Sequence, residues 1–592
     1  MTVRNPNDPI EVKRHSFAHL TAAAVLRLWP GSRLGVGPVI DDGFYHDVQV
    51  PDGGMLAEED LRQIEAEVRK MIAEKQSFKR EMKKINDAIT WLKERGQVFT
   101  QELAEDLKAS GEKEVSFYSN GEFANMCTGP HVKSTKELDP QAFSLARLAG
   151  VFWKSDSSRP QIQRIYGVAF GNKKDLKAYF AQQEAAKKRD HRKIGKELDL
   201  FTFSPLVGAG LPLFTPRGTL LRRLIEDYIS SLQEPLGYER VWIPHLAKSD
   251  LYKTSGHWDK FKDDLFHVRG KYEKTEFVMK PMNCPHHTQI YASRPRSYRD
   301  LPLRLCEFGV IYRDEQPGEL QGLSRVRSIT QDDGHVFCRP DQISEEAKKV
   351  YGIVQEFYRT FGIPLKIRLS VRDQKAPEKY LGTDEIWNTS EKLLRQIIED
   401  EGDDFEVAAG EAAFYGPKID FMGMDSLRRQ WQVATIQLDF NQPQRFGLKY
   451  QDKDGTQKEP VMIHRAIAGS IERFLSMMIE HFGGDFPVWL SPVQVALLPV
   501  KSAHNAFAEK VATDFRARGI RVEVYSASDT IGKKITIAVK QKIPYILVLG
   551  DKEIESGMFS ARNRGFRDTI SLVAAEFLER VAEKARTKSL EL

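Results

Sequence analysis

The spacing of apolar residues predicts helices joined by turns in the first 200 residues. In residues 11–50 the run RHSFAHLTAAAVLRLW has apolar positions at helical spacing, and a Gly/Pro-rich turn follows it. Residues 56–86 have the pattern of one long charged helix. Residues 173–198 are dense in Lys and Arg and poor in branched apolar residues, which predicts a solvated helix that joins two domains. The basic face of that helix would also suit a polyanion.

The rest of the chain changes character near residue 490. Residues 200–490 alternate helical patterns irregularly with strand-like runs such as PLKIRLSVR and RQWQVATIQLDF. This irregularity favours an antiparallel sheet with flanking helices over repeated βαβ units. In the last hundred residues, strand-like VQVALLPV, IRVEVYS and PYILVLG alternate regularly with helical runs, which predicts a small α/β domain with a parallel sheet. The fold class is therefore α+β multidomain.

Length and composition narrow the class of protein. At ~150 residues per domain, the 592 residues make about four domains. No apolar run approaches the ~20 residues that span a membrane, and the N-terminus has no secretory signal. Four cysteines in a chain of this size give no disulfide framework, so we expect a cytoplasmic protein without a membrane partner. The net charge of +5 tolerates an RNA partner without demonstrating one.

Three separate runs offer one potential metal ligand each: Cys284 in MKPMNCPHH, His335 in TQDDGHVF and His464 in VMIHRAIAGSIERF. One Cys and two His leave a coordination position free, as catalytic or substrate-binding zinc does. The three residues are far apart in the sequence, so only a folded domain of a few hundred residues could assemble them. Spacing alone is weak evidence, because most isolated Cys and His residues are packing or surface residues.

Two arginines are candidates for binding a nucleotide. Arg313 follows an apolar, strand-prone run, and Arg473 lies on an expected helix beside the small residues Gly469 and Ser470. A guanidinium can hold phosphate oxygens bidentately or stack on a base, which Lys does less well. No GxxxxGK[ST] loop is present. The alternative is that each is an ordinary surface arginine.

A second group of His and Cys residues lies near the N-terminus. His15 and His19 are four residues apart and therefore share one helical face, and the run CTGPH adds Cys127 and His131. These four residues allow two interpretations on chemistry alone. They could form a tetrahedral zinc site, or a pocket for acid/base chemistry that positions water.

Long runs of the sequence resemble one enzyme family. Residues 200–490 resemble a class II aminoacyl-tRNA synthetase core, and the whole chain resembles the bacterial threonyl-tRNA synthetases. LGYERVWIPHL, with Gly237 and Pro244, is similar to motif 1. YRDEQ with GLSRVRSITQDDGHVF is similar to motif 2, and AIAGSIERF to motif 3. RDHRKIGKELDLF, TSGHWDKF, KPMNCP, SYRDLPLRL, FYGPKID and QLDF also match the family.

The resemblance implies an order of domains. We expect an editing domain at 1–172, a linker helix at 173–198, a class II catalytic domain at 199–490 and an anticodon-binding domain at 491–592. The small ubiquitin-like domain that precedes the editing domain in many members is expected to be absent. Motif 1 implies a homodimer, which nothing in the composition indicates.

The resemblance also implies the chemistry of the central domain. Cys284, His335 and His464 would bind one Zn²⁺ per subunit, whose open positions accept the amino group and hydroxyl of L-threonine; valine lacks that hydroxyl. Asp333 would accept a hydrogen bond from the hydroxyl. Arg313 would hold the α-phosphate of ATP, and Arg473 the far end of ATP with its Mg²⁺. Further substrate, nucleotide or catalytic positions are Gln331, Lys418, Met282, Glu315, Tyr415, Gln432 and Gln437. The products are threonyl-adenylate and then threonyl-tRNA(Thr).

For the N-terminal quartet, the resemblance favours hydrolytic editing of seryl-tRNA(Thr). Serine has the hydroxyl and lacks only a methyl group, which is worth roughly 1–3 kcal/mol and is insufficient without a second sieve. Three departures from the family keep a decayed pocket open as an alternative. Asn125 replaces an Asp, Thr128 replaces an Arg, and Lys113 and Glu114 stand where a Lys near VSF is expected.

Other departures concern the metal and the anticodon. His286 replaces a usual Gly and Gly334 a usual Ala. For the bulky imidazole of His286 two interpretations stay open: an altered pocket wall that gives inhibitor resistance, or a harmless surface substitution. Glu553 and Arg562 match anticodon-contacting positions, but Ser528 replaces an amide and Thr536 an Arg. Losing a base contact typically costs ~1–3 kcal/mol. Anticodon reading is therefore relaxed or reorganised, unless Lys533, Lys534 and Lys542 compensate through phosphate contacts. The alternatives are an accessory or inhibitor-resistant paralogue with impaired editing, and an RNA-binding paralogue with weak charging.

Overall fold

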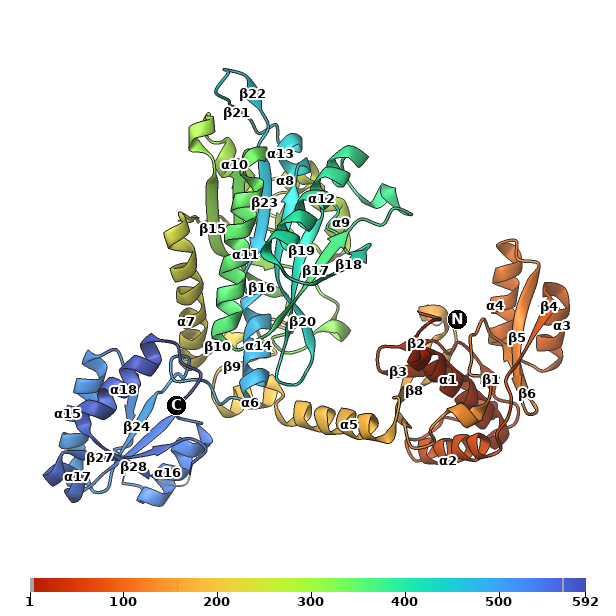
Figure 1. Ribbon diagram of the computed structural model, residues 1–592, viewed down its shortest axis with the longest axis horizontal. Coiled ribbons are helices and arrows are strands. Elements are labelled where there is room, and N and C mark those ends of the chain that lie inside the picture. Colours follow the sequence, from red (N-terminus) through yellow and green to blue (C-terminus); the bar gives the residue numbers. More distant parts are fainter. Residues whose placement is uncertain (1–4, 157, 527, 567–568) are drawn as a thin grey trace. The chain divides into compact units, whose positions relative to one another are not determined.

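The computed structural model describes residues 5–156, 158–526, 528–566 and 569–592. They fall into two compact units, Met1–Ala185 and Ala186–Leu592 (Figure 1). Each unit is described by itself.

In the first unit, α1 (Pro9–Leu28) confirms the predicted N-terminal helix and begins at Asp8, whose carboxylate accepts from the Ile10 N–H at 2.9 Å. It packs with α2 (Asp60–Ala73) against a mixed-length antiparallel sheet. The strands of this sheet are β1 (Arg33–Leu34), β2 (Val39–Ile40), β3 (Gly43–Gln49), β8 (Gln161–Ala169) and β7 (Phe143–Phe152). The segment predicted as a turn after α1 therefore also contains three short strands.

The prediction of one long helix over 56–86 is wrong. Helix α2 ends at Ala73, and Lys75 has the left-handed φ of 53° that stops it. The chain then forms β4 (Lys79–Lys84), which pairs with β5 (Glu114–Asn120), and β5 pairs with β6 (Phe123–Met126). Helices α3 (Ile85–Glu94) and α4 (Val98–Ala109) cover this small sheet through Leu92, Ala104 and Phe117.

The predicted linker helix is two helices. Helix α5 (Lys173–Lys188) buries Leu176 alone among its described residues, in agreement with the solvated face that its composition predicts. It ends before Asp190, whose side chain caps α6 (His191–Glu197) by accepting from the Arg192 N–H. The division between the two compact units falls within α5.

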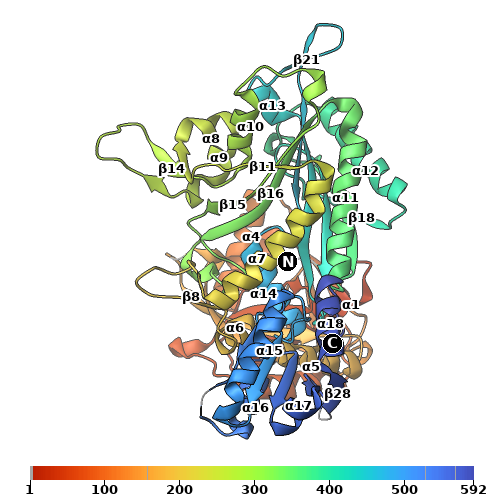
Figure 2. The ribbon, with the colours of Figure 1, turned by 90° about the vertical axis from the view of Figure 1, so that its left-hand side faces the viewer.

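The second unit is built on an eight-stranded sheet (Figure 2). Its order is β11 (Glu239–Arg240), β15 (Leu303–Tyr312), β16 (Ser328–Cys338), β23 (Val461–Ala466), β20 (Gln430–Asp439), β19 (Lys418–Met424), β17 (Leu365–Val371) and β18 (Phe405–Ala409). The β15–β16–β23–β20–β19–β17 pairs are antiparallel, as predicted, whereas the edge pairs β11–β15 and β17–β18 are parallel.

Helices cover this sheet and bury its main core. The covering helices are α7 (Pro216–Gln233), α11 (Ile343–Thr360), α12 (Asp384–Glu401) and α14 (Ile471–Phe482) (Figures 1 and 2). Side chains such as Phe357, Ile436, Ile463 and Phe474 form one continuous apolar cluster. Short helices α8 (Ser249–Ser255), α9 (His257–Phe261), α10 (Cys284–Ala292) and α13 (Asn441–Arg445) pack together near the end of β23.

The C-terminal part confirms the predicted alternation of strands and helices. Strands β25 (Val522–Val524), β24 (Val495–Pro499) and β26 (Tyr545–Leu549) are parallel, with α15 (Asn505–Ala517) and α16 (Ile531–Lys540) between them. Beyond the predicted pattern, β27 (Met558–Asn563) and β28 (Thr569–Val573) extend the sheet antiparallel, so the sheet is mixed. Helices α17 (Asp551–Ser556) and α18 (Ala574–Arg586) complete it. In the described part of the chain, no helix is long and apolar enough to cross a membrane.

Candidate functional site

Four predicted site residues form a row across the centre of the large sheet. In the antiparallel register, His335 of β16 lies opposite His464 of β23, His464 opposite Gln437 of β20, and Gln437 opposite Lys418 of β19. Directly paired residues place their side chains on the same face. Along β16, Gln331 and Asp333 alternate with His335 and therefore share that face. The fold thus gathers residues from four strands at one place.

Cys284 joins the two histidines of this row. It is the first residue of α10, and its Sγ lies with ligand nitrogens of His335 and His464 within 4.8 Å of one another. All three side chains are buried. Burial raises the pKa of the Cys284 thiol, whereas a bound cation stabilises the thiolate. One thiol and two imidazoles are a donor set for a divalent metal ion with a position left open.

Neighbouring polar groups orient the two imidazoles. His464 Nε2 lies 2.9 Å from Asp439 Oδ2, so its N–H donates to that carboxylate and Nδ1 keeps the lone pair. His335 Nδ1 lies 2.7 Å from His287 Nδ1 and its Nε2 lies 3.6 Å from Asp333 Oδ1. Asp439 is buried and also accepts from the Asn441 and Gln442 backbone N–H groups. Partners of this kind fix tautomers around metal sites.

Asp333 and Tyr415 are next to this cluster. The Asp333 carboxylate accepts from Asn283 Nδ2 at 3.0 Å, and burial raises its pKa. The ring of Tyr415 stacks on His464 with centroids 4.8 Å apart, and its hydroxyl donates to Gln437 Oε1 at 2.5 Å. These groups lie at the wall of the Cys/His cluster, as expected of residues that contact the same small ligand.

A cavity of about 710 Å³ opens beside the sheet. This volume is in the range of small-molecule and cofactor pockets. Five of the predicted residues line it: Arg313, Glu315, Gln331, Gln432 and Arg473. Gly469, with a φ of 65°, and Ser470, the N-cap of α14, form part of its wall.

Arg313 and Arg473 are unpaired cations in the described part of the chain, where neither has a carboxylate within 4 Å of its guanidinium. Arg313 lies over the Phe261 ring at 4.6 Å and donates to Met282 Sδ at 3.3 Å, and Arg473 lies over Trp431 at 5.4 Å. Burial lowers the pKa of both groups. Arg313 is half-buried and Arg473 is exposed at the cavity. Guanidinium groups without paired anions are suited to phosphate oxygens.

Unlike these two arginines, Glu315 has an ion-pair partner. Its carboxylate accepts from Arg325 at 2.8 Å, and Arg325 also binds Glu319. This ion pair joins the two ends of the loop between β15 and β16.

A buried aspartate that the sequence did not single out organises the far side of the row. Asp420 of β19 is fully buried and lies 2.8 Å from Lys418 Nζ. It accepts from Gln432 Nε2 at 2.7 Å and from Ser370 Oγ at 2.7 Å. Asp420 therefore fixes the positions of two predicted residues, Lys418 and Gln432. The only sequence signal for Asp420 was its place in the run FYGPKID.

The two departures near the metal cluster have separate environments. His286 is buried with both ring nitrogens lacking a partner among the described residues, and its ring lies 6.2 Å from that of Tyr252. It is not among the residues that line the large cavity. Gly334 pairs with Arg465, and a Cβ there would lie 2.3 Å from the guanidinium carbon. Glycine therefore lets Arg465 lie flat over β16, where it binds Asp332 at 2.7 Å.

Sequence reasoning also missed His257, the first residue of α9. Its Nε2 lies 3.6 Å from Cys284 Sγ, its Nδ1 lies 2.8 Å from Ser255 Oγ, and the ring is fully buried. Burial lowers the pKa of His257 to about 3. A lone His after a Gly carries no periodic signal, so only its presence in TSGHWDKF pointed to it.

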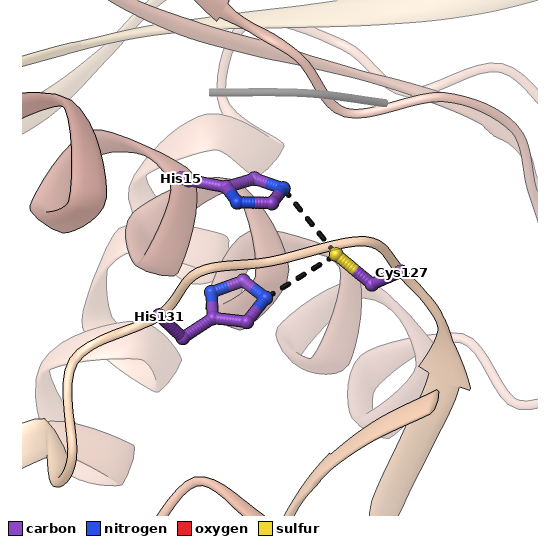
Figure 3. Close-up of side chains that lie close together, drawn as sticks. All are labelled: His15, Cys127 and His131. Carbon is purple, nitrogen blue, oxygen red and sulfur yellow. Dashed lines mark hydrogen bonds between the residues drawn. The ribbon is translucent and has the colours of Figure 1, made fainter. Parts of the chain in front are cut away.

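The N-terminal quartet also comes together, and Figure 3 shows three of its members, His15, Cys127 and His131. Cys127 Sγ lies 3.3 Å from His15 Nε2 and 3.3 Å from His131 Nε2, and the two imidazole rings stack at 4.4 Å. His15 donates from Nδ1 to the Pro130 carbonyl at 3.2 Å, which leaves the lone pair on Nε2. The His19 ring lies 4.8 Å from that of His131. His15, Cys127 and His131 form a second group whose ligand atoms lie within 4.8 Å.

A cavity of about 20 Å³ adjoins this group, which is room for one water molecule. His15, His19, Cys127 and Asn125 line it, and so does His46 of β3, which the sequence analysis missed. His19 Nε2 is buried without a partner in the described chain. His46 donates from Nδ1 to the Asp47 carbonyl at 3.1 Å and lies against Gly37.

Burial makes these imidazoles neutral near pH 7. It lowers the pKa of His15 to about 4, that of His19 to about 3, and that of His131 well below its usual value. Burial raises the pKa of the Cys127 thiol to about 11. The pocket can therefore accept protons weakly and orient water, and its lining contains no carboxylate or lysine.

The departures in this pocket differ in their effect. Asn125 lines the cavity, and its Oδ1 accepts from the Met126 N–H at 2.9 Å. Thr128, Lys113 and Glu114 are exposed, so they do not replace a charge inside the pocket.

The C-terminal candidates have defined partners. Glu553 accepts from the Gly550 N–H at 3.0 Å and so caps α17, and Arg562 lies half-buried on β27. Ser528 and Thr536 are exposed. Of the three lysines considered as alternative phosphate contacts, Lys534 is not available, because it is buried and donates to the Pro499 carbonyl at 2.8 Å. Lys533 pairs with Asp529, and Lys542 with Asp485.

Comparisons with known proteins agree with this arrangement. The chain matches the tRNA synthetase class II core domain (G, H, P, S and T) over residues 266–482. It matches an anticodon binding domain over 494–584 and the threonyl and alanyl tRNA synthetase second additional domain over 115–166. The crystal structure of the RNA binding domain of threonyl-tRNA synthetase from Cryptosporidium parvum Iowa II is similar, with a TM-score of 0.64 and 36% identity. That likeness covers 68% of this chain and 99% of the other.

Relatives are similar over nearly their whole length. The threonine–tRNA ligase of Gloeobacter violaceus is 44% identical over 96% of this chain and 92% of its own. That of Halalkalibacterium halodurans is 44% identical over 98% of this chain and 90% of its own. On this similarity, and on the three matching domains, the chain belongs to the threonine–tRNA ligase family of class II aminoacyl-tRNA synthetases.

Proposed function

We propose that this chain activates L-threonine with ATP and transfers it to tRNA(Thr). One observation carries the proposal beyond family membership. A buried Cys/His cluster with an open ligand position shares a face of the sheet with Gln331, which lines a large cavity. In the described part of the chain, the two arginines that line this cavity have no carboxylate partner. An amino acid with a hydroxyl and a nucleotide with phosphates are the two ligands for which such groups are suited.

Cys284, His335 and His464 would hold Zn²⁺. Their donor set and their mutual distances fit this ion, and Asp439 and His287 orient the imidazoles as zinc sites require. When bound, the ion supplies open coordination positions for the amino group and hydroxyl of threonine. Asp333 accepts a hydrogen bond from that hydroxyl. Valine has the same shape without the hydroxyl, so it leaves these polar groups unsatisfied.

ATP would occupy the 710 Å³ cavity. Arg313 would bind the α-phosphate and Arg473 the distal end of the nucleotide, where bound Mg²⁺ would supply further neutralisation of phosphate charge. Gln331, Glu315, Met282 and Gln432 contact the nucleotide or the amino acid. Tyr415, Gln437 and Lys418 position the amino acid from the row beside the metal cluster.

The reaction follows in two steps. A carboxylate oxygen of threonine bonds to the α-phosphorus, the bond to the bridging oxygen breaks, and pyrophosphate leaves. Arg313 stabilises the charge that develops on the α-phosphate oxygens. A terminal ribose hydroxyl of tRNA(Thr) then attacks the acyl carbon, AMP leaves as the ester forms, and the hydroxyl proton is released.

The partners of the enzyme are proposed from particular surfaces. Glu553 and Arg562 are the candidate contacts to anticodon bases, with exposed Ser528 and Thr536 giving fewer base-reading groups than the family pattern. A homodimer is supported by the motif 1 segment. There β11 is an edge strand of the large sheet, and Trp242 beside it is 77% exposed.

The N-terminal pocket would hydrolyse seryl-tRNA(Thr). His15, His19 and Cys127 line a space for one water molecule, and His131 lies beside Cys127. The neutral imidazoles can orient that water and accept its proton. With Asn125 in place of a carboxylate, we expect this hydrolysis to be slow.

The test is charging of tRNA(Thr) by the purified protein, with threonine or serine, for the wild type and the His15→Ala/His19→Ala variant. The proposal predicts threonyl-tRNA with both proteins and more seryl-tRNA with the variant. Equal seryl-tRNA from the two proteins would remove the editing role. No charging with either amino acid would remove the ligase assignment and favour an RNA-binding paralogue.

A further inference from the structure

His191 connects three parts of the second unit through one buried imidazole. It is the first residue of α6 and is 4% exposed. Its Nδ1 lies 2.6 Å from Glu480 Oε1 of α14, and its Nε2 lies 3.0 Å from the backbone nitrogen of Leu323. Since the Leu323 N–H donates to Nε2, that nitrogen carries the lone pair, and Nδ1–H donates to the carboxylate. Both nitrogens are used, and one tautomer satisfies both contacts.

Leu323 holds the loop between β15 and β16 in place. This loop, residues 313–327, is exposed for much of its length, whereas Leu323 is 0% exposed and belongs to the main core. Gln321 and Ser324, on either side of it, line the 710 Å³ cavity. The intervening Gly322 has a φ of 52°, and a Cβ there would lie 2.2 Å from His191 Nε2. The loop is therefore built directly against the imidazole.

Glu480 connects the same imidazole to the opposite wall of the cavity. It accepts from the His191 backbone N–H at 3.1 Å and from Arg429 at 2.6 Å. Bonds from His191 and Arg429 lower the pKa of Glu480 even though burial raises it. Helix α14, on which Glu480 lies, begins with the turn that carries Arg473. His191 thus joins the loop on one side of the cavity to the helix on the other side.

We propose that His191 is a positioning residue for the ATP pocket. It does not line the cavity, but its hydrogen bond to Leu323 sets where Gln321, Ser324 and Arg325 present their polar groups. This inference rests on the proposed binding of ATP in that cavity. Without this bond the loop keeps its other contacts but samples more conformations. Ordering it when ATP binds then costs part of the binding free energy.

Two substitutions separate the two contacts of the imidazole. In His191→Gln the amide reaches the place of Nε2, so its oxygen can still accept from the Leu323 N–H. In His191→Asn the amide reaches the place of Nδ1, so it can donate to Glu480 but leaves the Leu323 N–H buried without a partner. Loss of such a partner costs enough to change an equilibrium about tenfold or more. Gly322→Ala adds a Cβ between loop and imidazole and breaks the same contact from the other side.

The experiment is threonine-dependent ATP–pyrophosphate exchange, with KM measured separately for ATP and for threonine. We expect His191→Asn and Gly322→Ala to raise the KM for ATP about tenfold while the KM for threonine changes less than about threefold. His191→Gln should stay within about threefold of the wild type for ATP. Lys193→Ala, at an exposed position of the same helix, is the control and should leave both values unchanged.

The results distinguish this inference from the proposed function. If the wild type shows no threonine-dependent exchange, the proposed function fails. If the wild type is active and His191→Asn and His191→Gln change the KM for ATP equally, or in proportion to their melting temperatures, the imidazole is a structural group and the inference is overturned. Where His191→Asn does not fold, the KM for ATP of Gly322→Ala decides by the same criterion.

Discussion

The tautomer of His464 gives the sharpest prediction about the metal cluster. Asp439 accepts four hydrogen bonds: Oδ1 from the Asn441 and Gln442 backbone N–H groups at 2.8 and 2.9 Å, and Oδ2 from Gln442 Nε2 at 2.7 Å and His464 Nε2 at 2.9 Å. In Asp439→Asn, the amide oxygen can keep both backbone bonds. The amide NH₂ then faces two donors.

The Gln442 amide can rotate to avoid the clash with the new NH₂ group, whereas His464 can avoid it only by changing its tautomer. Gln442 Oε1 has no partner among the described residues, so its amide can turn and present that oxygen. His464 can relieve the clash only by moving its proton to Nδ1, the nitrogen that is left for the metal. Losing an orienting partner of this kind typically costs 10–100-fold in metal affinity, about 1.4–2.7 kcal/mol.

The assay is zinc titration of the metal-stripped protein against a competing chelator, followed by pyrophosphate exchange. We expect Asp439→Asn to bind zinc about 10–100-fold more weakly. The KM for threonine should rise at limiting zinc and recover in excess zinc, with the KM for ATP unchanged. Asp454→Asn, the same change at an exposed position, is the control. Wild-type zinc affinity in a folded Asp439→Asn protein would refute the tautomer argument.

Four further predictions concern the other sites. Arg473→Lys should raise the KM for ATP about tenfold, because an ammonium cannot hold two phosphate oxygens, and Arg339→Lys, at an arginine paired with Asp341, should not. Metal analysis should find one zinc per chain, lost in Cys284→Ala and kept in Cys127→Ala; two zinc ions would assign a metal to the N-terminal group instead. Asn125→Asp should speed hydrolysis of seryl-tRNA(Thr), measured with preformed substrate, by placing a carboxylate at the water-sized cavity; an unchanged rate would mean that this residue does not limit hydrolysis. Because burial lowers the pKa of His15 to about 4, the imidazole stays neutral as pH falls from 8 to 5, so hydrolysis should show no inflection near 6.5.

The same lowered pKa values predict how stability depends on pH. His15 and His19 have folded-state pKa values of about 4 and about 3, below the ordinary 6.5. The unfolded chain therefore binds more protons between pH 6.5 and those values. The first unit should lose stability as pH falls through this window, which thermal melts at pH 7.5 and 5 would measure. A melting temperature of that unit that does not fall would show that these histidines are not buried in the neutral form.

Much of the element order could be predicted from the sequence because apolar periodicity sets it. The N-terminal helix, the central antiparallel pairs and the C-terminal alternation all follow from spacing. The helix expected over 56–86 failed where the pattern was weakest. Residues 79–84, KREMKK, have no alternation of apolar and polar positions, and their pairing with β5 makes them a strand.

The site could be predicted only partly, and for a different reason. Spacing cannot show that His335 lies opposite His464, because strand register is set by the whole sheet. Family resemblance, not periodicity, supplied those residues. His46, His257 and Asp420 were missed because a single buried polar residue leaves no periodic pattern of its own. The availability of Lys534 was misjudged because burial of a lysine stem is not visible in the sequence.

One measurement tests the central claim most directly: charging of tRNA(Thr) by the purified chain with threonine or valine, before and after its metal is removed. The account predicts charging with threonine and not with valine, loss of charging when zinc is stripped, and its return when zinc is restored. Absence of threonine charging in the zinc-loaded protein, or full charging by a protein shown to hold no metal, would contradict it.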